Sequence, residues 1–265
     1  MTTSAEAPQL LCYDMGDMVL AFSTMRQGVG VSQGAYACFN INHYCGDEPQ
    51  AVQVNRRLLC EAIGVDMGRL VIPHQTHGTA VRLIEEDFFT LSHPERARML
   101  EGVDAVMTDM AGVCIGVSTA DCIPVLLCDE AHHAVCAVHA GWRGTVARIV
   151  QSAVREMKAA YQTRPGQLRA VIGPGISLKN FEVGDEVYQA FAEAGFDMSA
   201  MARRYEKWHI DLPLCNQMQL EEAGVPSAQI HQAKICTYDD YDRFFSARRL
   251  GIRSGRIFTG IMRKV

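Results

Sequence analysis

The chain has 265 residues, of which 48% are hydrophobic and 21% charged, the composition of an ordinary globular protein with a substantial core. The formal net charge at pH 7 is −5, and charges of one sign form no long block. This charge argues against a nucleic-acid-binding or anionic-membrane surface, so we expect neither nucleic acid nor a membrane as a partner.

The N-terminal residues 1–8 contain neither a basic segment nor an apolar one, so we predict no signal peptide. Ten cysteines occur at irregular spacings without a CxxC pair, and we expect most of them to be reduced and buried. These features predict a cytoplasmic protein. Because no repeat, low-complexity segment or long linker divides the sequence, we expect a single domain over residues 1–265.

The N-terminal third predicts one strand and one helix. A short apolar run predicts the strand at residues 18–23, and turn-rich sequence follows over residues 27–46. Residues 50–63 then have the apolar spacing of a helix and end at Gly64, a residue type that commonly terminates helices.

The middle of the chain is dense in short runs of Val and Ile bounded by turns. These runs predict strands at residues 81–84, 103–108, 113–118, 123–128 and 134–139. The strand at 123–128 is apolar at both odd and even positions, which is typical of a sheet covered on both faces. Pro124 cannot donate a ladder hydrogen bond, so it suggests an edge strand or a bulge. Asp121 and Pro124 also interrupt the apolar stretch 111–128, which favours a buried sheet over a membrane helix.

The clearest helix is predicted at residues 146–161, where apolar side chains recur along one face and Thr145 would be the N-cap. Further elements are a strand at 169–172, helices at 185–194 and 214–223, and a last strand at 256–261. Together the elements predict an α/β fold in which central β-sheets are covered by helices.

Two of the central strands place a cysteine and a histidine close together. The strands at 123–128 and 134–139 are predicted to form a hairpin through the four-residue loop 129–132, with Cys128 opposite His133. In that register Cys122 lies opposite His139 on the same face, with Cβ atoms about 4.5–5.5 Å apart. A thiolate and an imidazole at that separation can bind one Zn²⁺. A slip of one residue would send the two side chains to opposite faces.

A third ligand is expected from the segment His74-Gln75-Thr76-His77-Gly78-Thr79, just before the strand at 81–84. Structural zinc sites normally have four protein ligands, whereas three ligands leave a position for water or substrate, so three favour catalysis. Two alternatives stay open. Cys122 can simply be packed against His139 in the core, or the pair can form a metal-free nucleophile in which the base activates the thiol.

The segment His139-Ala140-Gly141-Trp142-Arg143-Gly144-Thr145 combines a strand end, a glycine turn and a helix start. Backbone N–H groups at a helix start attract anions, and Arg143 can clamp a phosphate or carboxylate there. The spacing matches no standard P-loop, so ATP binding is not predicted. The alternative is that the glycines only make the turn and Arg143 is solvated.

Together these motifs resemble the signature blocks of the YfiH-type family, also called laccase-domain or polyphenol oxidase proteins. The blocks are His74-Gln75-Thr76-His77-Gly78-Thr79, Thr119-Ala120-Asp121-Cys122-Ile123-Pro124-Val125 and His139-Ala140-Gly141-Trp142-Arg143-Gly144. Shorter matches, such as Gly173-Pro174-Gly175-Ile176, extend the resemblance over nearly the full length. One departure occurs where family members often have Leu-Gly-x-His before a Gly-Asp pair, because this chain has Ile41-Asn42-His43-Tyr44-Cys45.

The resemblance implies a single α/β domain with a zinc site formed by His77, Cys122 and His139. It implies phosphate-dependent cleavage of adenosine, inosine and methylthioadenosine, together with adenosine deamination, so that purine nucleosides and phosphate are the expected small-molecule partners. Bound Zn²⁺ would lower the pKa of water towards about 7 and supply a hydroxide for attack on the purine C6. We expect catalytic roles for Cys122, for Asp121 as a proton carrier, and for Arg143, which would hold phosphate against C1′ of the ribose.

Two other functions remain open at this point. The older family naming implies a copper-dependent polyphenol oxidase with Cu²⁺ as cofactor, and His–Cys–His resembles a blue-copper ligand set. The sequence places no axial Met, however, and has no multi-histidine cluster for the reduction of oxygen. The third hypothesis is a non-catalytic protein with a structural zinc, which needs a fourth ligand and has His74 as its obvious candidate.

Overall fold

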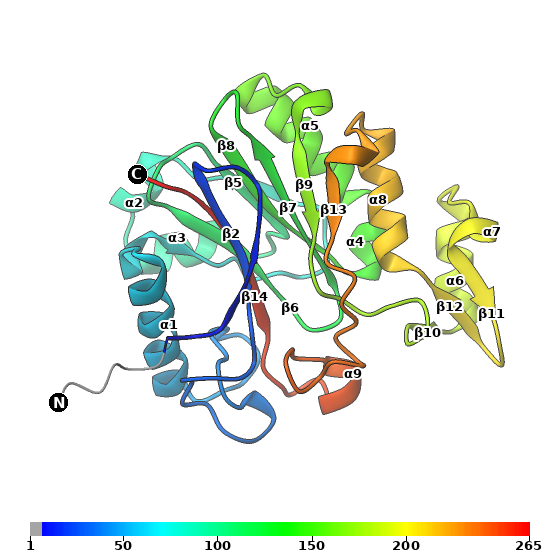
Figure 1. Ribbon diagram of the computed structural model, residues 1–265, viewed down its shortest axis with the longest axis horizontal. Coiled ribbons are helices and arrows are strands. Elements are labelled where there is room, and N and C mark those ends of the chain that lie inside the picture. Colours follow the sequence, from blue (N-terminus) through cyan, green and yellow to red (C-terminus); the bar gives the residue numbers. More distant parts are fainter. Residues whose placement is uncertain (1–6) are drawn as a thin grey trace.

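The structure, a computed structural model, describes residues 7–265 and is built around two large β-sheets that face each other (Figure 1). Part of the segment behind the signal-peptide prediction, residues 1–6, lies outside the described residues. Among residues 7–265 no helix combines the length and apolarity needed to cross a bilayer. The predicted α/β fold with helix-covered sheets is confirmed.

The first sheet has five strands in the order β1-β2-β14-β6-β3. Their bounds are Leu10–Tyr13 (β1), Val19–Thr24 (β2), Leu70–Val71 (β3), Cys114–Thr119 (β6) and Ile257–Arg263 (β14). The second sheet has six strands in the order β13-β9-β7-β8-β5-β4. Their bounds are Val81–Leu83 (β4), Ala105–Thr108 (β5), Ile123–Asp129 (β7), Ala134–Ala140 (β8), Arg169–Ile172 (β9) and Ile230–Gln232 (β13).

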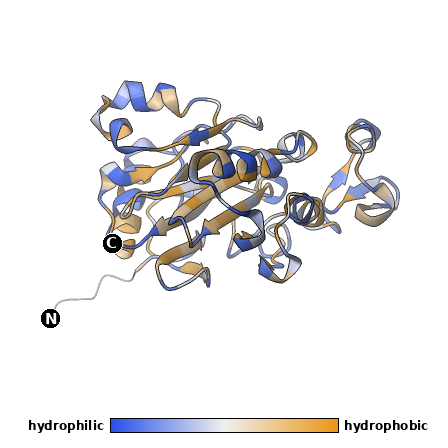
Figure 2. Cartoon of the chain, turned by 90° about the horizontal axis from the view of Figure 1, so that it is seen from above, coloured by the Kyte–Doolittle hydropathy of each residue, from blue (hydrophilic) through white to orange (hydrophobic). Residues whose placement is uncertain are grey.

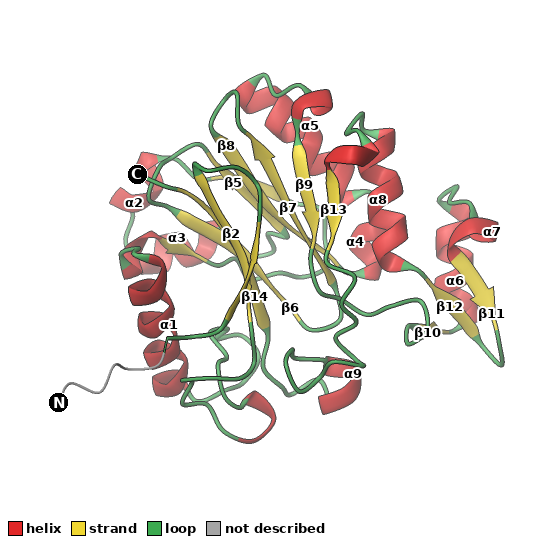
Figure 3. Ribbon diagram, viewed as in Figure 1, coloured by secondary structure: helices red, strands yellow, loops and turns green. Residues whose placement is uncertain are grey.

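Helices cover the outer faces of these two sheets (Figure 3). α1 (Pro49–Ile63) covers the five-stranded sheet, and the six-stranded sheet is covered by α4 (Trp142–Val146), α5 (Ile149–Tyr161) and α8 (Leu212–Glu222). Two short helices, α2 (Glu86–Thr90) and α3 (His93–Met99), pack instead against the core between the sheets, and α9 (Ala247–Leu250) packs against a small cluster around Phe244 and Phe245. A small sheet of β10 (Glu182–Val183), β12 (Trp208–Ile210) and β11 (Ala202–Arg204) projects from the body with α6 (Asp185–Glu193) and α7 (Met198–Met201), at the right of Figure 1.

Apolar side chains alternate between two core layers along the central strands. On β7, Val125 and Leu127 contribute to the core beneath α5 and α8, whereas Leu126 and Cys128 lie in the core between the two sheets. Figure 2 shows the strands as predominantly hydrophobic. Full burial of each large apolar side chain contributes about 1.5–3 kcal/mol, so both layers stabilise the sheet. The prediction of a sheet covered on both faces is confirmed.

The predicted hairpin forms, but its register is wrong by two residues. Pro124 is opposite His139 and Asp129 is opposite Ala134, so the loop comprises residues 130–133 rather than 129–132. His133 closes the turn at a φ of 57°, while the Asp129 carboxylate accepts a hydrogen bond from the backbone N–H of His132. A shift of two residues preserves the side-chain face, because strands have a period of two, and the inferred proximity survives the error.

The prediction that Pro124 marks an edge or a bulge is also wrong, because β7 lies inside the six-stranded sheet. The carbonyl of Pro124 accepts a hydrogen bond from the N–H of Gly173, so its nitrogen faces the same side. The ladder between β7 and β9 begins only at Val125 and Ile172. The proline nitrogen therefore faces the end of that ladder, where no N–H donor is required.

The helix predicted at residues 146–161 is divided into α4 and α5, and Thr145 is not its N-cap. Gly141 is the N-cap of α4, and the backbone turns at Arg148, which has a φ of 63°, before α5 begins. The guanidinium carbon of Arg148 lies 3.7 Å from the centre of the Phe196 ring, and the guanidinium donates a hydrogen bond to the Ala194 carbonyl. These contacts stabilise the turn between the two helices. The apolar stripe is confirmed from residue 149 onward.

All ten cysteines are free thiols, and the prediction that most are buried is only half right. The buried ones are Cys60, Cys114, Cys128, Cys136 and Cys215. Cys12 is exposed and the remaining four are half-buried. One of those four, Cys122, belongs to the site described next.

Candidate metal centre

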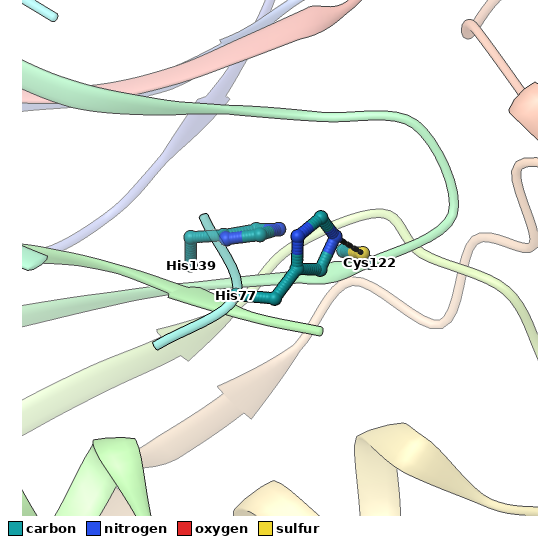
Figure 4. Close-up of side chains that lie close together, drawn as sticks. All are labelled: His77, Cys122 and His139. Carbon is teal, nitrogen blue, oxygen red and sulfur yellow. Dashed lines mark hydrogen bonds between the residues drawn. The ribbon is translucent and has the colours of Figure 1, made fainter. Parts of the chain in front are cut away.

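The three predicted ligands come from segments at one end of the layer between the sheets (Figure 4). His77 lies on the connection from β3 to β4, and Cys122 lies on the connection from β6 to β7. Each of these connections leaves the five-stranded sheet and enters the six-stranded one. His139 is the second-last residue of β8. The fold therefore brings together side chains that are separated by 45 and 17 residues in the sequence.

The distances between the three side chains fit a single metal ion. One ligand atom from each residue lies within 4.8 Å of the others, and Cys122 Sγ is 3.8 Å from His77 Nε2. Tetrahedral Zn²⁺ with ordinary bond lengths would separate a sulfur and a nitrogen ligand by about 3.6 Å. A thiolate with two imidazoles is also a donor set that suits zinc. The residues present therefore fit the metal implied by the sequence.

Asp104 organises two of the three ligands and is the residue that the sequence analysis missed. Its buried carboxylate lies 2.7 Å from His139 Nδ1, which leaves Nε2 of that ring for a metal. The same carboxylate accepts hydrogen bonds from the backbone N–H groups of Thr76, His77 and Gly78. The sequence offered one signal, which is that Asp104 is a charged residue at the edge of the apolar run 103–108. A charged residue is rarely buried without hydrogen-bonding or charged partners, so this position indicated such partners.

Electrostatics at the site favour the ligand form of the cysteine. Burial opposes ionisation of the Cys122 thiol, but the facing His139 and the hydrogen bonds with His139 and His77 lower its pKa to about 6. Burial also disfavours a charged His139, yet Cys122 and Asp104 together raise the pKa of its imidazole to about 9. Metals bind the thiolate rather than the thiol, so this arrangement prepares Cys122 for coordination near neutral pH.

Unusual backbone conformations shape the two turns that carry His77 and Cys122. His77 has a φ of 64° and Asp121 a φ of 82°, a region that few residues other than glycine adopt. Gly141 closes the site from a third side. A Cβ at residue 141 would lie 2.6 Å from Cδ2 of His77 and 3.1 Å from Sγ of Cys122, so only glycine fits beside the ligands.

The other two predicted catalytic residues, Asp121 and Arg143, lie near the ligands in the sequence, but neither is among the residues that line the cavity beside the ligands. The Asp121 carboxylate accepts hydrogen bonds from Thr237 Oγ1 and from the backbone N–H of Arg248, each at 2.7 Å. Arg143 is exposed on the first turn of α4, with its guanidinium 4.3 Å from the Trp142 ring centre. Asp121 thus ties the Cys122 turn to α9, and Arg143 presents its charge to solvent next to Gly141.

A cavity of about 190 Å³ opens beside the three ligands. Its aromatic wall is formed by Tyr44 and His74, whose rings stack with centres 4.0 Å apart, and both Glu101 carboxylate oxygens lie 2.8 Å from His74 Nδ1. His74 is therefore bound to Glu101 and is not part of the three-residue cluster. The cavity is lined by Asn42, Tyr44, Cys45, His74, Gln75, His77, Ser118, Thr119, Ala120, Cys122, His139, Ala247, Ile252 and Arg256.

Comparison with known proteins decides the family. The family described as "Multi-copper polyphenol oxidoreductase laccase" matches residues 20–264. This chain belongs to that family, the YfiH-type laccase-domain proteins. One relative, from Bacteroides thetaiotaomicron, is named purine nucleoside phosphorylase and is 51% identical over 91% of this chain and 90% of its own. Another, from an unknown prokaryotic organism, is named adenosine deaminase RL5 and is 45% identical over 93% of this chain and 94% of its own.

Solved structures of YfiH-type proteins share the fold. The hypothetical protein YfiH from Bacillus licheniformis matches with a TM-score of 0.89 and 28% identity, covering 97% of both chains. YlmD from Geobacillus stearothermophilus matches with a TM-score of 0.87 and 30% identity, covering 94% of this chain and 93% of that one. The family resemblance seen in the sequence is therefore confirmed over nearly the whole YfiH-type chain.

Proposed function

We propose that this protein is a zinc-dependent purine nucleoside phosphorylase that also deaminates adenosine, with adenosine, inosine and methylthioadenosine as its nucleosides. The observation that supports this proposal is a three-ligand centre, His77, Cys122 and His139, beside a cavity lined by aromatic and polar side chains. Two close relatives carry the names of these two activities. We further propose that residues 1–265 form one catalytic domain in the cytoplasm.

Three protein ligands favour a catalytic rather than a structural zinc, because a fourth position stays open to solvent or substrate. When bound there, Zn²⁺ supplies Lewis acidity and a lowered pKa for water. The chain supplies the geometry: Asp104 fixes the ring of His139, and its bonds to the 76–78 backbone fix His77. Cys122 completes the set with a thiol whose pKa is lowered to about 6.

The cavity also suits a purine nucleoside. Tyr44 and His74 form an aromatic wall against which a flat purine base can pack, since aromatic rings favour stacked or edge-on contacts. No carboxylate lines the cavity among the described residues, so a neutral nucleoside that enters it buries no unpaired negative charge of the protein. No methionine lines it either within residues 7–265, and a blue-copper site would require one nearby as its usual axial ligand.

The roles of Asp121 and Arg143 complete the proposal. Asp121 directly precedes Cys122 in the same turn and lies outside the residues that line the cavity. We propose that its carboxylate, held by Thr237 and Arg248, carries protons to and from the cavity during the reaction. Arg143 is an exposed cation two residues after Gly141, and Gly141 lies against His77 and Cys122. We propose that Arg143 holds the phosphate that attacks C1′ of the ribose.

Metal analysis combined with one assay tests the function. The purified protein should contain about one zinc per chain, and adenosine with phosphate should yield ribose 1-phosphate and, separately, ammonia. Removal of the metal by a chelator should abolish both products, and added zinc should restore them. Oxidation of a phenol by a copper-loaded protein that converts no nucleoside would contradict the proposal.

Arg143→Lys should weaken phosphorolysis, because an ammonium keeps the charge but lacks the planar fork that binds two phosphate oxygens. The expected result is a rise of about 10- to 100-fold in the KM for phosphate, equivalent to losing about 1.5–3 kcal/mol. Deamination consumes water rather than phosphate and should change little, and the zinc content should stay the same. Equal loss of both reactions with a lower melting temperature would show that Arg143 is only structural.

A further inference from the structure

His74 forms a histidine–carboxylate pair at the wall of the cavity beside the candidate metal ligands. Both carboxylate oxygens of Glu101 lie 2.8 Å from Nδ1 of His74. The other ring nitrogen, Nε2, has no hydrogen-bond partner among residues 7–265, and it does not belong to the buried polar atoms of these residues that lack one. The side chain of His74 is 35% exposed and lines the cavity. Of the two ring nitrogens, Nε2 is therefore the one that is free to contact a molecule in the cavity.

The ring of His74 is held in one orientation. Its face stacks on the Tyr44 ring, with the ring centres 4.0 Å apart and the planes at 20°. The backbone N–H of His74 donates to the Leu100 carbonyl at 3.0 Å, and its carbonyl accepts from the N–H of Gly102 at 2.9 Å. Together with the Glu101 contact, these interactions fix both the backbone and the side chain. A reacting group that is held in this way needs little reorganisation before it transfers a proton.

Few other groups on the cavity wall can exchange a proton near neutral pH. Apart from His74 and the three candidate ligands, the described residues that line the cavity include two with an acidic proton, Tyr44 and Cys45. Burial raises the pKa of the Tyr44 hydroxyl and of the Cys45 thiol, so both groups stay protonated. Arg256 keeps its charge, as guanidinium groups do in proteins. Asp121, the proposed proton carrier, lies outside the lining residues. His74 is therefore the group on the wall that can pass a proton to a substrate.

The contact with Glu101 decides which nitrogen of His74 exchanges protons. A carboxylate at hydrogen-bond distance accepts the Nδ1–H bond, so this proton stays in place and Nε2 gives or takes the other. Histidine is the side chain that most often acts as a general acid or base, and a carboxylate that orients it is a recurring partner. The stack on Tyr44 places His74 in the aromatic wall against which the purine would pack. The pair therefore combines orientation, access and a position beside the base.

We propose that His74 is the general acid of nucleoside cleavage and that Glu101 is the residue that positions it. This assignment rests on the proposed phosphorolysis and adds to it the group that protonates the departing purine. As a phosphate oxygen bonds to C1′ of inosine, the bond from C1′ to N9 breaks and its electron pair stays with the base. The proton on Nε2 of His74 moves to N7 of the base, which leaves as neutral hypoxanthine. The proton that hydrogen phosphate gives up when it becomes an ester returns the ring to its acid form, so the reaction consumes no net proton.

Phosphorolysis of inosine and of 7-methylinosine by the zinc-loaded protein tests the assignment. The methyl group on N7 gives the base the positive charge that a proton would give, so this base departs without a general acid. His74→Gln should lower kcat for inosine by about 100- to 10,000-fold, the usual contribution of general acid catalysis, and should leave kcat for 7-methylinosine nearly unchanged. Glu101→Gln should lower kcat for inosine less, because its amide oxygen can still accept the Nδ1–H bond of His74.

Two further measurements need no turnover. The zinc content of His74→Gln should equal that of the wild type, because His74 lies outside the three-residue cluster. Inosine is not phosphorolysed when phosphate is absent, so calorimetry then measures its Kd. This Kd should rise by no more than about 10-fold in His74→Gln, the usual worth of one hydrogen bond, because a general acid acts on kcat rather than on binding.

His132→Gln is the matched control. Nδ1 of His132 lies 2.9 Å from the Asp129 carboxylate, and the side chain of His132 is 36% exposed. This second histidine–carboxylate pair lies at the far end of β7 from Cys122, outside the residues that line the cavity. His132→Gln should therefore keep the wild-type kcat for both nucleosides and the wild-type zinc content.

The outcomes separate this inference from the proposed function. Equal losses of kcat for the two nucleosides in His74→Gln, or no loss for either, overturn the general-acid assignment and leave the proposed phosphorolysis standing. A wild type that cleaves inosine but not 7-methylinosine also overturns the assignment, because the methylated base resembles the protonated one. Loss of zinc from His74→Gln would make His74 a ligand instead of an acid. A wild type that cleaves neither nucleoside in the presence of phosphate contradicts the proposed function, and the general-acid assignment with it.

Discussion

Asp104→Asn is expected to weaken zinc binding by about 10- to 100-fold, the usual effect of removing a hydrogen-bond partner of a metal ligand. The Asp104 carboxylate lies against His139 and accepts bonds from three backbone N–H groups around His77. An amide has a single acceptor oxygen, so its NH₂ group would face some of these donors. The free energy of unfolding should also fall by about 1.5–3 kcal/mol. Competition with a chromophoric chelator measures the first effect, and denaturant unfolding measures the second.

Asp129→Asn is the matched control for this experiment. Asp129 is equally buried at the far end of β7, where its carboxylate accepts from the His132 backbone N–H and lies 2.9 Å from His132 Nδ1. This variant should lose a comparable amount of stability while binding zinc as the wild type does. Similar zinc loss in both variants would mean that Asp104 acts through general stability and not through the ligands.

Cys122→Ala is expected to lose both the metal and all nucleoside turnover. A methyl group cannot coordinate, and the two remaining imidazoles give an incomplete set for zinc. Zinc measured by atomic absorption should fall to the level of the chelator-treated wild type, and neither ribose 1-phosphate nor ammonia should form. The fold should persist, because Cys122 lies in a turn outside β7 and is half-buried.

Cys128→Ala separates the role of the ligand from that of a packed thiol. Cys128 lies near the far end of β7, six residues after Cys122, which corresponds to about 20 Å at about 3.3 Å per residue. It is buried in the core between the sheets, so its loss should cost about 1 kcal/mol of stability and leave zinc and turnover unchanged. If Cys128→Ala released zinc as completely as Cys122→Ala, the assignment of the ligands would be refuted.

The sequence predicted the strands and helices whose apolar spacing is regular. The strand at 169–172 agrees with β9 at both ends, and the predicted helix at 50–63 differs from α1 by one residue. The two-residue strands β3 and β10 carry too few residues for a periodic signal. The division between α4 and α5 was missed because the left-handed backbone at Arg148 depends on tertiary contacts with Phe196 and Ala194.

The proximity of His77, Cys122 and His139 was predictable from motif and hairpin together, whereas the position of Asp104 was not. Cys122 and His139 stay on one face of the hairpin even when the predicted register is wrong by two residues. An approximately correct loop was therefore enough to predict that the two side chains are close. The contacts of Asp104 span 26 to 35 residues, and they arise only when the turn at His77 folds back over β8.

The two connections that carry His77 and Cys122 both cross from the five-stranded sheet to the six-stranded one, and a metal ion bound by these residues would therefore also have a mechanical role. An ion bound to both residues and to His139 joins two covalently distant crossings at the open end of the layer between the sheets. A metal ion at this position would resist the sliding of one sheet over the other. Zinc should therefore slow amide hydrogen exchange in β6, β7 and β8 together. A ligand that binds only the folded arrangement raises the free energy that is required to open each element it joins. If zinc slows exchange in this way, the same three side chains that form the proposed catalytic site also hold the two sheets in their relative position.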